Sequence, residues 1–264
     1  MSLLRVLDRI PGIHFAINQL HMRRVINAAL GWFPIVRTLP QSGVRYRWRY
    51  LDSIPLAEEL FGQKVYDGAI SPGLETFADL GCNVGHYIAL LADRTGRRDL
   101  RGLAIDADPD MVKETEWVIA ANGLSEVVPV CGLVARPGAA GERDFYLHPC
   151  KIKSSLYAVD EPGQPDKGPW TKTRVREVDV EALWRARFGA QRCHLLKVDI
   201  EGAEADFLTE DNPFLERVDT IVLEIHKWVV SPDTIDRRLR NLGFRKTAAL
   251  RDSPTLEIAS YARA

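Results

Sequence analysis

The segment from Phe77 to Tyr87 constrains the fold more than any other part of the chain. It reads Phe-Ala-Asp-Leu-Gly-Cys-Asn-Val-Gly-His-Tyr: a short apolar run with one acid, a loop with two glycines, and the start of a helical pattern. Glycine lets the backbone turn tightly and approach a ligand closely, and the first turn of a helix offers unpaired N–H groups. This order predicts a cofactor loop of an α/β fold. Because many turns contain two glycines, the surrounding pattern must decide whether this loop binds a cofactor or is an ordinary turn.

The residues after Glu75 alternate between short apolar segments and helical patterns. We expect strands at 77–80, 103–106, 127–131, 194–199 and 220–225, with room for two more in 244–261. Helices are expected at 87–94, 109–122, 180–188, 203–208 and 232–242, with Asp108 as the N-cap before Pro109. Strands interleaved with helices predict a largely parallel sheet covered on both faces.

The first 65 residues form a separate, mainly helical and arginine-rich extension in this interpretation, and residues 66–264 form the main domain. Two or three amphipathic helices are expected in 1–39, a strand in 44–50 and a short helix in 54–61. Residues 1–50 contain one acid, Asp8, and eight arginines: Arg5, Arg9, Arg23, Arg24, Arg37, Arg45, Arg47 and Arg49. The extension is either a cap on the main domain or a basic arm that contacts a membrane surface or an anionic substrate. The arginines of 45–49 belong either to a solvated edge strand or to a phosphate or carboxylate site.

The bulk composition narrows the function. A net charge of -1 argues against a nucleic-acid-binding protein, and 46% hydrophobic residues allow a full core. Four scattered cysteines, without metal-ligand spacing, indicate reduced thiols in a cytoplasmic protein. Residues 1–10 lack the apolar core of a secretory signal, and no run approaches the ~20 apolar residues of a membrane-spanning helix.

Polar side chains stand at the ends of four expected strands. They are Asp79, Asp106, Asp199 with Glu201, and Glu224 with His226. Each residue alone has a structural explanation, such as a helix cap or a solvated turn. Because ligands of open α/β sheets bind outside the carboxyl ends of the strands, the whole set predicts a functional site.

The position of Asp106 indicates the kind of cofactor. It lies 21 residues after Gly85, where a carboxylate accepts hydrogen bonds from a ribose diol. The loop is not G-x-G-x-x-G, so the sequence favours a smaller adenosyl ligand over a dinucleotide.

These motifs resemble S-adenosylmethionine-dependent methyltransferases of the FkbM type. The resemblance rests on the segments 77–85, 104–109 and 220–226, and most specifically on the box Lys-Val-Asp-Ile-Glu-Gly-Ala-Glu at 197–204. It covers roughly residues 66–246. Asp106-Ala107 departs from the Glu-Pro that family members often have, although both pairs carry a carboxylate.

The resemblance implies a Rossmann-like sheet of seven strands with helices on both faces, and S-adenosylmethionine as the cofactor. Asp79, Gly81, Asn83 and Gly85 would surround its methionine part, Asp106 would hold the ribose, and Gly132 and Leu133 would lie near the adenine. The expected cofactor residues also include Cys82, Ala107 and Asp199.

Methyl transfer to a hydroxyl requires a general base close to the acceptor. His226, Asp199 and Glu224 are the candidates, and His226 is favoured because its ordinary pKa lies near neutral pH. Asp199 and Glu201 would orient the acceptor. We expect no metal; a divalent ion held by Asp199, Glu201, Glu224 and His226 is the alternative.

The predicted function is O-methylation of a hydroxyl on a sugar, a glycan or another secondary-metabolite-type small molecule. Carboxylate or nitrogen methylation is the alternative, and a non-catalytic adenosyl-binding partner module is a third. Nucleic-acid methylation is not expected, since 199–202 reads Asp-Ile-Glu-Gly and not (Asn/Asp)-Pro-Pro-(Tyr/Phe). The loop 160–169 is either a lid over the acceptor or a surface insertion. The oligomeric state stays open.

Overall fold

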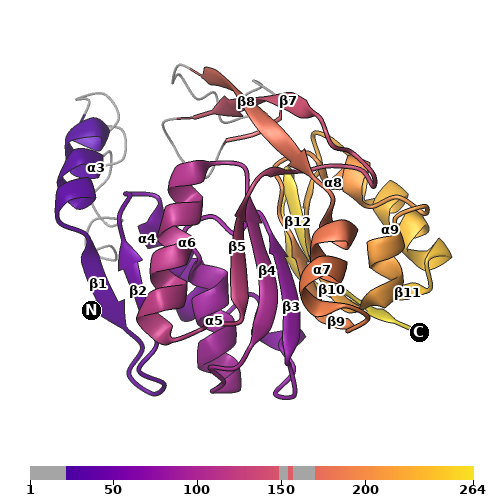
Figure 1. Ribbon diagram of the computed structural model, residues 1–264, viewed down its shortest axis with the longest axis horizontal. Helices are drawn as coiled ribbons and strands as arrows, with labels where there is room; N and C mark the ends of the chain where they lie inside the picture. The colour runs from indigo at the N-terminus through magenta and orange to yellow at the C-terminus, as the bar shows by residue number, and fades with distance from the viewer. Residues whose placement is uncertain (1–21, 149–153, 157–169) are drawn as a thin grey trace.

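The computed structural model describes residues 22–148, 154–156 and 170–264 (Figure 1). The main sheet contains β3 (Thr76–Leu80), β4 (Arg101–Asp106), β5 (Val127–Cys131), β9 (Cys193–Val198), β10 (Val218–His226), β11 (Phe244–Asp252) and β12 (Leu256–Arg263). The helices of the main domain are α5 (His86–Thr95), α6 (Pro109–Asn122), α7 (Val180–Phe188), α8 (Glu204–Phe207) and α9 (Pro232–Asn241), and the single-turn helices η2 (Asp67–Ala69) and η4 (Pro213–Arg217) precede strands.

The seven strands lie in the order β11-β12-β10-β9-β3-β4-β5. The five from β10 to β5 are parallel, and β12 runs antiparallel to both β10 and β11. The expected Rossmann-like α/β fold is confirmed, including the two strands of the tail. The chain order reverses between β3 and β9, so the loops after these two strands border the crevice where such sheets bind ligands.

Alternation along the strands divides the core between the two faces of the sheet. In β3, Ala78 and Leu80 pack with α7, α9 and η4, whereas Phe77 packs with α5 and the N-terminal extension. Leu195 and Leu196 of β9 divide in the same way. Successive side chains of a strand point to opposite faces, so each strand contributes to both apolar layers. Asp108 caps α6 as expected, since its carboxylate accepts the N–H of Asp110 at 2.9 Å.

The described part of the N-terminal extension is less helical than the sequence predicts. It contains α3 (Met22–Trp32), a hairpin of β1 (Ile35–Thr38) and β2 (Arg45–Trp48), then α4 (Ser53–Ala57) and the π-helical turn η1 (Glu58–Gly62). Val44, Tyr46 and Leu60 join the same apolar cluster as Phe77 of the main sheet. The extension therefore covers the helices and the sheet on this side as an integral layer.

A second sheet lies beyond the carboxyl ends of the main strands (Figure 1). It has the order β6-β8-β7, formed by β6 (Leu133–Val134), β7 (Glu142–Leu147) and β8 (Thr171–Val178). Its apolar side chains Leu133, Phe145 and Val175 pack against Ala107 and Ala203. This sheet covers the loops after β4 and β9.

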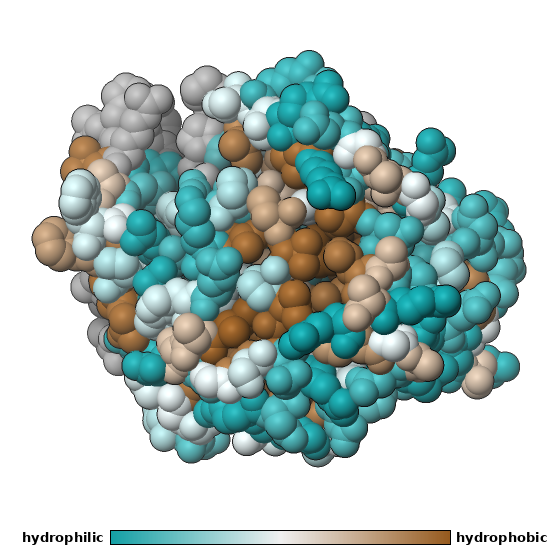
Figure 2. All heavy atoms as spheres, in the orientation of Figure 1, coloured by the Kyte–Doolittle hydropathy of each residue, from teal (hydrophilic) through white to brown (hydrophobic). Residues whose placement is uncertain are grey.

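The apolar surface is unevenly distributed over the molecule. Figure 2 shows hydrophobic residues gathered across the middle of one face, between α6 and α7, with hydrophilic residues around them. Within the described residues, no helix is both long and apolar enough to cross a membrane. Several features named from the sequence lie outside the described residues. They are the helices expected before residue 22, the residues Arg5, Arg9 and Cys150, and the loop 160–169.

Candidate active site

The glycine loop lies directly against the box at 197–204, at the end of β9. Gly81 has a φ of 81°, and a Cβ built on it would lie 1.6 Å from the carbonyl oxygen of Asp199. The N–H groups of Gly81 and Cys82 both donate to the carbonyl of Ile105. No side chain larger than hydrogen fits at Gly81, so this glycine is required by close packing and by its positive φ.

Asp106 fixes the other side of the loop. Its carboxylate accepts the N–H of Asn83 and the N–H of Asp108, both at 2.8 Å. Burial raises the pKa of Asp106 to about 7, although these two hydrogen bonds lower it. A cavity of about 60 Å³ opens here, and Gly81, Asn83, Asp106, Ala107, Gly132 and Leu133 line it. With Asp199, which also lines this cavity, seven of the predicted cofactor residues therefore come together.

Asp79 and Gly85, which are also expected at the cofactor, line neither this cavity nor the larger one described below. The side chain of Asp79 is fully buried under the loop, 3.6 Å from Lys197 Nζ. Gly85 begins α5 with a φ of 75°, and its Cβ would lie 3.0 Å from the backbone of Thr115. Asp79 pairs with Lys197, and Gly85 packs against Thr115 of α6. Both residues therefore support the loop on the side away from the cavity.

A cavity of about 520 Å³ adjoins the first one. The β9 and β10 ends form its floor, α4 and η1 supply Leu56 and Glu59, and the β11–β12 hairpin supplies Arg251. Two indole side chains, Trp170 and Trp228, also line it. Cys82 borders this cavity with its buried Sγ next to the Thr115 hydroxyl at 3.5 Å, and burial raises the pKa of its thiol well above the usual value.

His226 ends β10 between two carboxylates. Its Nδ1 lies 2.9 Å from Glu204 Oε1, and its Nε2 lies 3.3 Å from Glu201 Oε2. Burial alone would lower the pKa of His226, but the charges of Glu201 and Glu204 raise it well above the ordinary value. The two carboxylates on either side of the ring therefore favour its charged form.

Glu201 adopts an uncommon backbone conformation. Its φ is 48°, and the Ser155 hydroxyl donates to its carbonyl oxygen at 2.9 Å. Burial raises the pKa of its carboxyl group, with a partial offset from His226. The turn thereby directs the Glu201 side chain, which is 30% exposed, into the cavity.

Lys197 is a buried cation beneath the site. Its Nζ lies 3.1 Å from Asp199 Oδ2 and 3.6 Å from Asp79 Oδ1, and the side chain is only 7% exposed. Burial opposes its charge, yet Asp199 and Asp79 raise its pKa above the usual range. One oxygen of Asp199 is thus fixed from below, and its other oxygen is available for the cavity.

Glu224 lies in the same cavity but belongs to a different set of contacts. The Tyr66 hydroxyl donates a hydrogen bond to it, and burial followed by the charge of Asp199 raises its pKa. Tyr66 also lies 3.4 Å from Glu59, which pairs with Arg251 at 2.8 Å.

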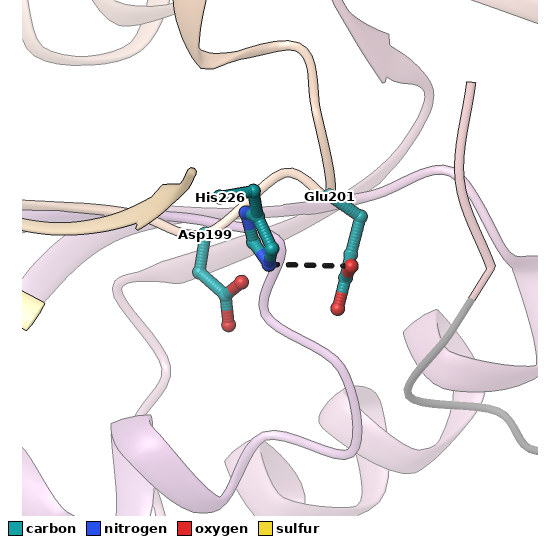
Figure 3. A group of neighbouring side chains, drawn as sticks. All are labelled: Asp199, Glu201 and His226. Atoms are coloured by element: carbon teal, nitrogen blue, oxygen red, sulfur yellow. Dashed lines mark ion pairs between the residues drawn. The ribbon is translucent and has the colours of Figure 1, made fainter. Parts of the chain in front are cut away.

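The structure brings three of the four predicted catalytic residues into one cluster. Asp199, Glu201 and His226 each place one ligand atom within 4.8 Å of the others, while Glu224 is not part of the group (Figure 3). Sequence reasoning missed Glu204, Lys197 and Tyr66 as site residues. Lys197 and Glu204 belong to the box at 197–204. A lysine within an apolar strand was a signal that could have indicated Lys197, whereas nothing in the sequence indicated Tyr66.

The arginines of the segment 45–49, in β2 and directly after it, are engaged by the protein itself. Arg47 and Arg49 bind the buried carboxylate of Glu114 in α6, at 2.6 Å and 3.1 Å, and Arg47 also covers the ring of Trp117. Arg45 donates to the carbonyl of Ala121. These contacts attach the extension to α6 and leave neither Arg47 nor Arg49 as a free anion-binding group.

Comparison with known proteins gives a match to a family domain and a match to a named relative. Residues 69–246 match the methyltransferase FkbM domain. A protein named Methyltransferase 1, from Beauveria bassiana, is 28% identical over 183 residues, which are 64% of this chain and 71% of that protein.

Similar solved structures are more remote. A ribosomal protein L11 methylase from Lactobacillus delbrueckii is 12% identical with a TM-score of 0.43, over 79% of this chain and 80% of its own. The CcbJ methyltransferase from Streptomyces caelestis is 11% identical with a TM-score of 0.44, over 81% and 98%. TrmK from M. capricolum, solved with S-adenosyl-homocysteine, is 6% identical with a TM-score of 0.45, over 77% and 68%. Values this low carry no argument about the substrate.

Proposed function

Because the chain belongs to the FkbM methyltransferase family, we propose that it transfers a methyl group from S-adenosylmethionine to a hydroxyl of a sugar, a glycan or another secondary-metabolite-type small molecule. The adenosyl part of the cofactor lies at the smaller cavity, with Asp106 at the ribose and Gly132 and Leu133 at the adenine, and the rest extends past Gly81 and Asn83, which line both cavities, into the larger one. The acceptor enters the larger cavity.

One observation carries this proposal: Asp199 and Glu201 line both cavities. They stand where a methyl group leaving one ligand would meet an oxygen of the other. Methyl transfer needs the acceptor oxygen in line with the breaking bond between carbon and sulfur, so the positioning groups must be at this junction.

Asp199 is the best-placed group to accept the hydrogen of the acceptor hydroxyl. Lys197 fixes Oδ2, which leaves Oδ1 for the acceptor. A positioned carboxylate that takes a proton in the transition state contributes roughly 10²–10⁴-fold to the rate. His226, which lies between Glu201 and Glu204, positions the Glu201 carboxylate in this arrangement.

The lining of the larger cavity supports a polyhydroxylated acceptor. Trp170 and Trp228 offer flat apolar surfaces, and Glu59 and Arg251 offer hydrogen-bonding groups in the same lining. A sugar ring presents both an apolar face and several hydroxyls. A cavity with a few placed polar groups among aromatic side chains suits such a ligand.

The test is transfer of label from methyl-labelled S-adenosylmethionine to a panel of sugars, glycosides, polyketides and carboxylic acids. We expect label in a hydroxylated acceptor, and a fall of about 10²-fold or more in kcat for Asp199→Asn. Asp233→Asn, an exposed carboxylate of α9, is the matched control. Absence of S-adenosylhomocysteine binding in calorimetry would refute the proposal.

A further inference from the structure

The cluster of Asp199, Glu201 and His226 has the composition and the spacing of a metal-binding triad. Their ligand atoms lie within 4.8 Å of one another. Two ligands that share a divalent ion at about 2.1–2.2 Å lie up to about 4.3 Å apart, so the triad needs only a small contraction. Figure 3 shows the three side chains pointing toward a common region from the end of β9, the following turn and the end of β10.

Glu204 determines which nitrogen of His226 faces this region. Its carboxylate is fully buried and accepts the N–H of Gly202 at 3.0 Å and that of Ile200 at 3.3 Å. A carboxylate accepts from the ring, so Nδ1 carries the hydrogen and donates at 2.9 Å. A carboxylate behind a histidine is the usual partner that fixes the tautomer of a metal-binding imidazole.

The remaining nitrogen faces negative charge. In the neutral ring, Nε2 presents a lone pair toward Glu201 Oε2 at 3.3 Å. Two electron-rich atoms at this separation repel each other unless a cation lies between them. A proton on Nε2 would remove the repulsion between His226 and Glu201 only. A divalent ion in its place would also bind the free oxygen of Asp199.

The location provides the second, independent observation. Asp199 and Glu201 line both the cofactor cavity and the acceptor cavity, so an ion between them would be reached by an oxygen atom entering from the larger one. Lys197 compensates Asp199 and Asp79 from below, and among the described residues its ion pairs do not include Glu201. The donor set of two carboxylate oxygens and one imidazole suits a hard divalent cation such as Mn²⁺.

We propose that Asp199, Glu201 and His226 bind a divalent cation, with Glu204 as a positioning residue. This inference rests on the proposed function. The ion binds the acceptor hydroxyl and lowers its pKa. With Asp199 Oδ1 bound to the ion, the O–H bond breaks and its proton passes to water in the open cavity, in place of the direct transfer to Asp199. The oxygen then forms a bond to the methyl carbon, and the bond between carbon and sulfur breaks with its electron pair left on sulfur.

The experiment titrates the full chain, freed of metal by EDTA and dialysis, with Mn²⁺ alone, and follows free Mn²⁺ by electron paramagnetic resonance. We expect saturation at one ion per chain. Glu201→Gln and Asp199→Asn should weaken binding at least about tenfold, and Glu204→Gln about 10–100-fold with an unchanged stoichiometry. Asp233→Asn should bind as the wild type does.

Absence of saturable binding would overturn the inference, as would triad variants that bind Mn²⁺ like the wild type. The cavity position of Glu201, 30% exposed, makes Glu201→Gln informative because its substitution does not disturb the core. Calorimetry with S-adenosylhomocysteine in EDTA separates the two proposals. Cofactor binding without Mn²⁺ binding refutes the metal alone, and Mn²⁺ binding without cofactor binding refutes the proposed function alone.

Discussion

The two cavities of the site are built in different ways. The smaller one is formed by backbone groups and small side chains from neighbouring segments, such as Gly81, Asn83 and Ala107. The larger one is lined by charged and aromatic side chains from distant parts of the chain, such as Glu59 and Arg251, which are 192 residues apart. Backbone groups impose one shape, whereas side chains can be exchanged without changing the fold.

This difference indicates where specificity resides. A cofactor that does not vary is served by a loop whose N–H groups and glycines are fixed by the sheet. In the proposed function, an acceptor would be bound by the extension and by the β11–β12 hairpin, which meet through the ion pair of Arg251 and Glu59. Substitutions should therefore separate into those that damage the fold and the cofactor cavity, and those that alter only the acceptor.

Gly81→Ala should have the largest effect. The added methyl group would overlap the Asp199 carbonyl at 1.6 Å, and the φ of 81° disfavours any side chain. We expect a loss of about 4 kcal/mol or more in the free energy of unfolding and no detectable cofactor binding. Gly96→Ala is the control, since its φ is 68° but nothing lies within 4 Å; it should cost about 1 kcal/mol. Equal melting temperatures for the two variants would contradict the packing argument.

Lys197→Met should break the charge balance beneath both cavities. Asp79 would remain fully buried without its cation, at a cost of about 3–5 kcal/mol by urea unfolding. Adding Asp79→Asn should recover most of this loss, because the buried charge is then gone. If the double variant is as unstable as the single one, Lys197 stabilises the fold by packing and not by charge.

His86 should give the contact between α5 and the extension a dependence on pH. Its Nε2 donates to the carbonyl of Arg47 at 3.0 Å, and burial lowers its pKa from 6.5 to about 4. Above about pH 6.5 the His86 ring is neutral in both the folded and the unfolded chain. As the pH falls toward 4, the unfolded chain binds the proton first. Stability should therefore fall by up to about 3 kcal/mol over this window. His86→Gln keeps a donor and should remove this part of the slope; an unchanged slope would exclude His86 as its source.

Asp106→Asn tests the separation of the two cavities most finely. An amide keeps one acceptor oxygen for the N–H groups of Asn83 and Asp108, so one of these bonds is lost. We expect the Kd of S-adenosylhomocysteine to rise about tenfold, or about 1.4 kcal/mol, in calorimetry. Glu224→Gln, in the larger cavity, should change this Kd by less than about twofold. A comparable loss in both variants would mean that the cavities are energetically coupled.

Most of the main domain could be predicted from the sequence. The periods of the apolar residues placed α6, α7 and β5 at the bounds that the structure has, and the predicted cap Asp108 is confirmed. The hairpin partner β1 was not predicted, because its four residues are all exposed and show no alternation of apolar and polar faces. Short exposed strands depend on their partner for stability, so a local pattern does not reveal them.

The sequence by itself determined the sheet, the glycine loop and the set of acids at the strand ends, since these depend on local periodicity and on residues close together in the chain. Only the tertiary structure decided the use of each acid. It buried Asp79 on Lys197, directed Asp106 to the loop and paired His226 with Glu201 and Glu204. The reason is that burial and charge pairing depend on neighbours from other strands, and a strand-end position fixes the location of a side chain but not its partner.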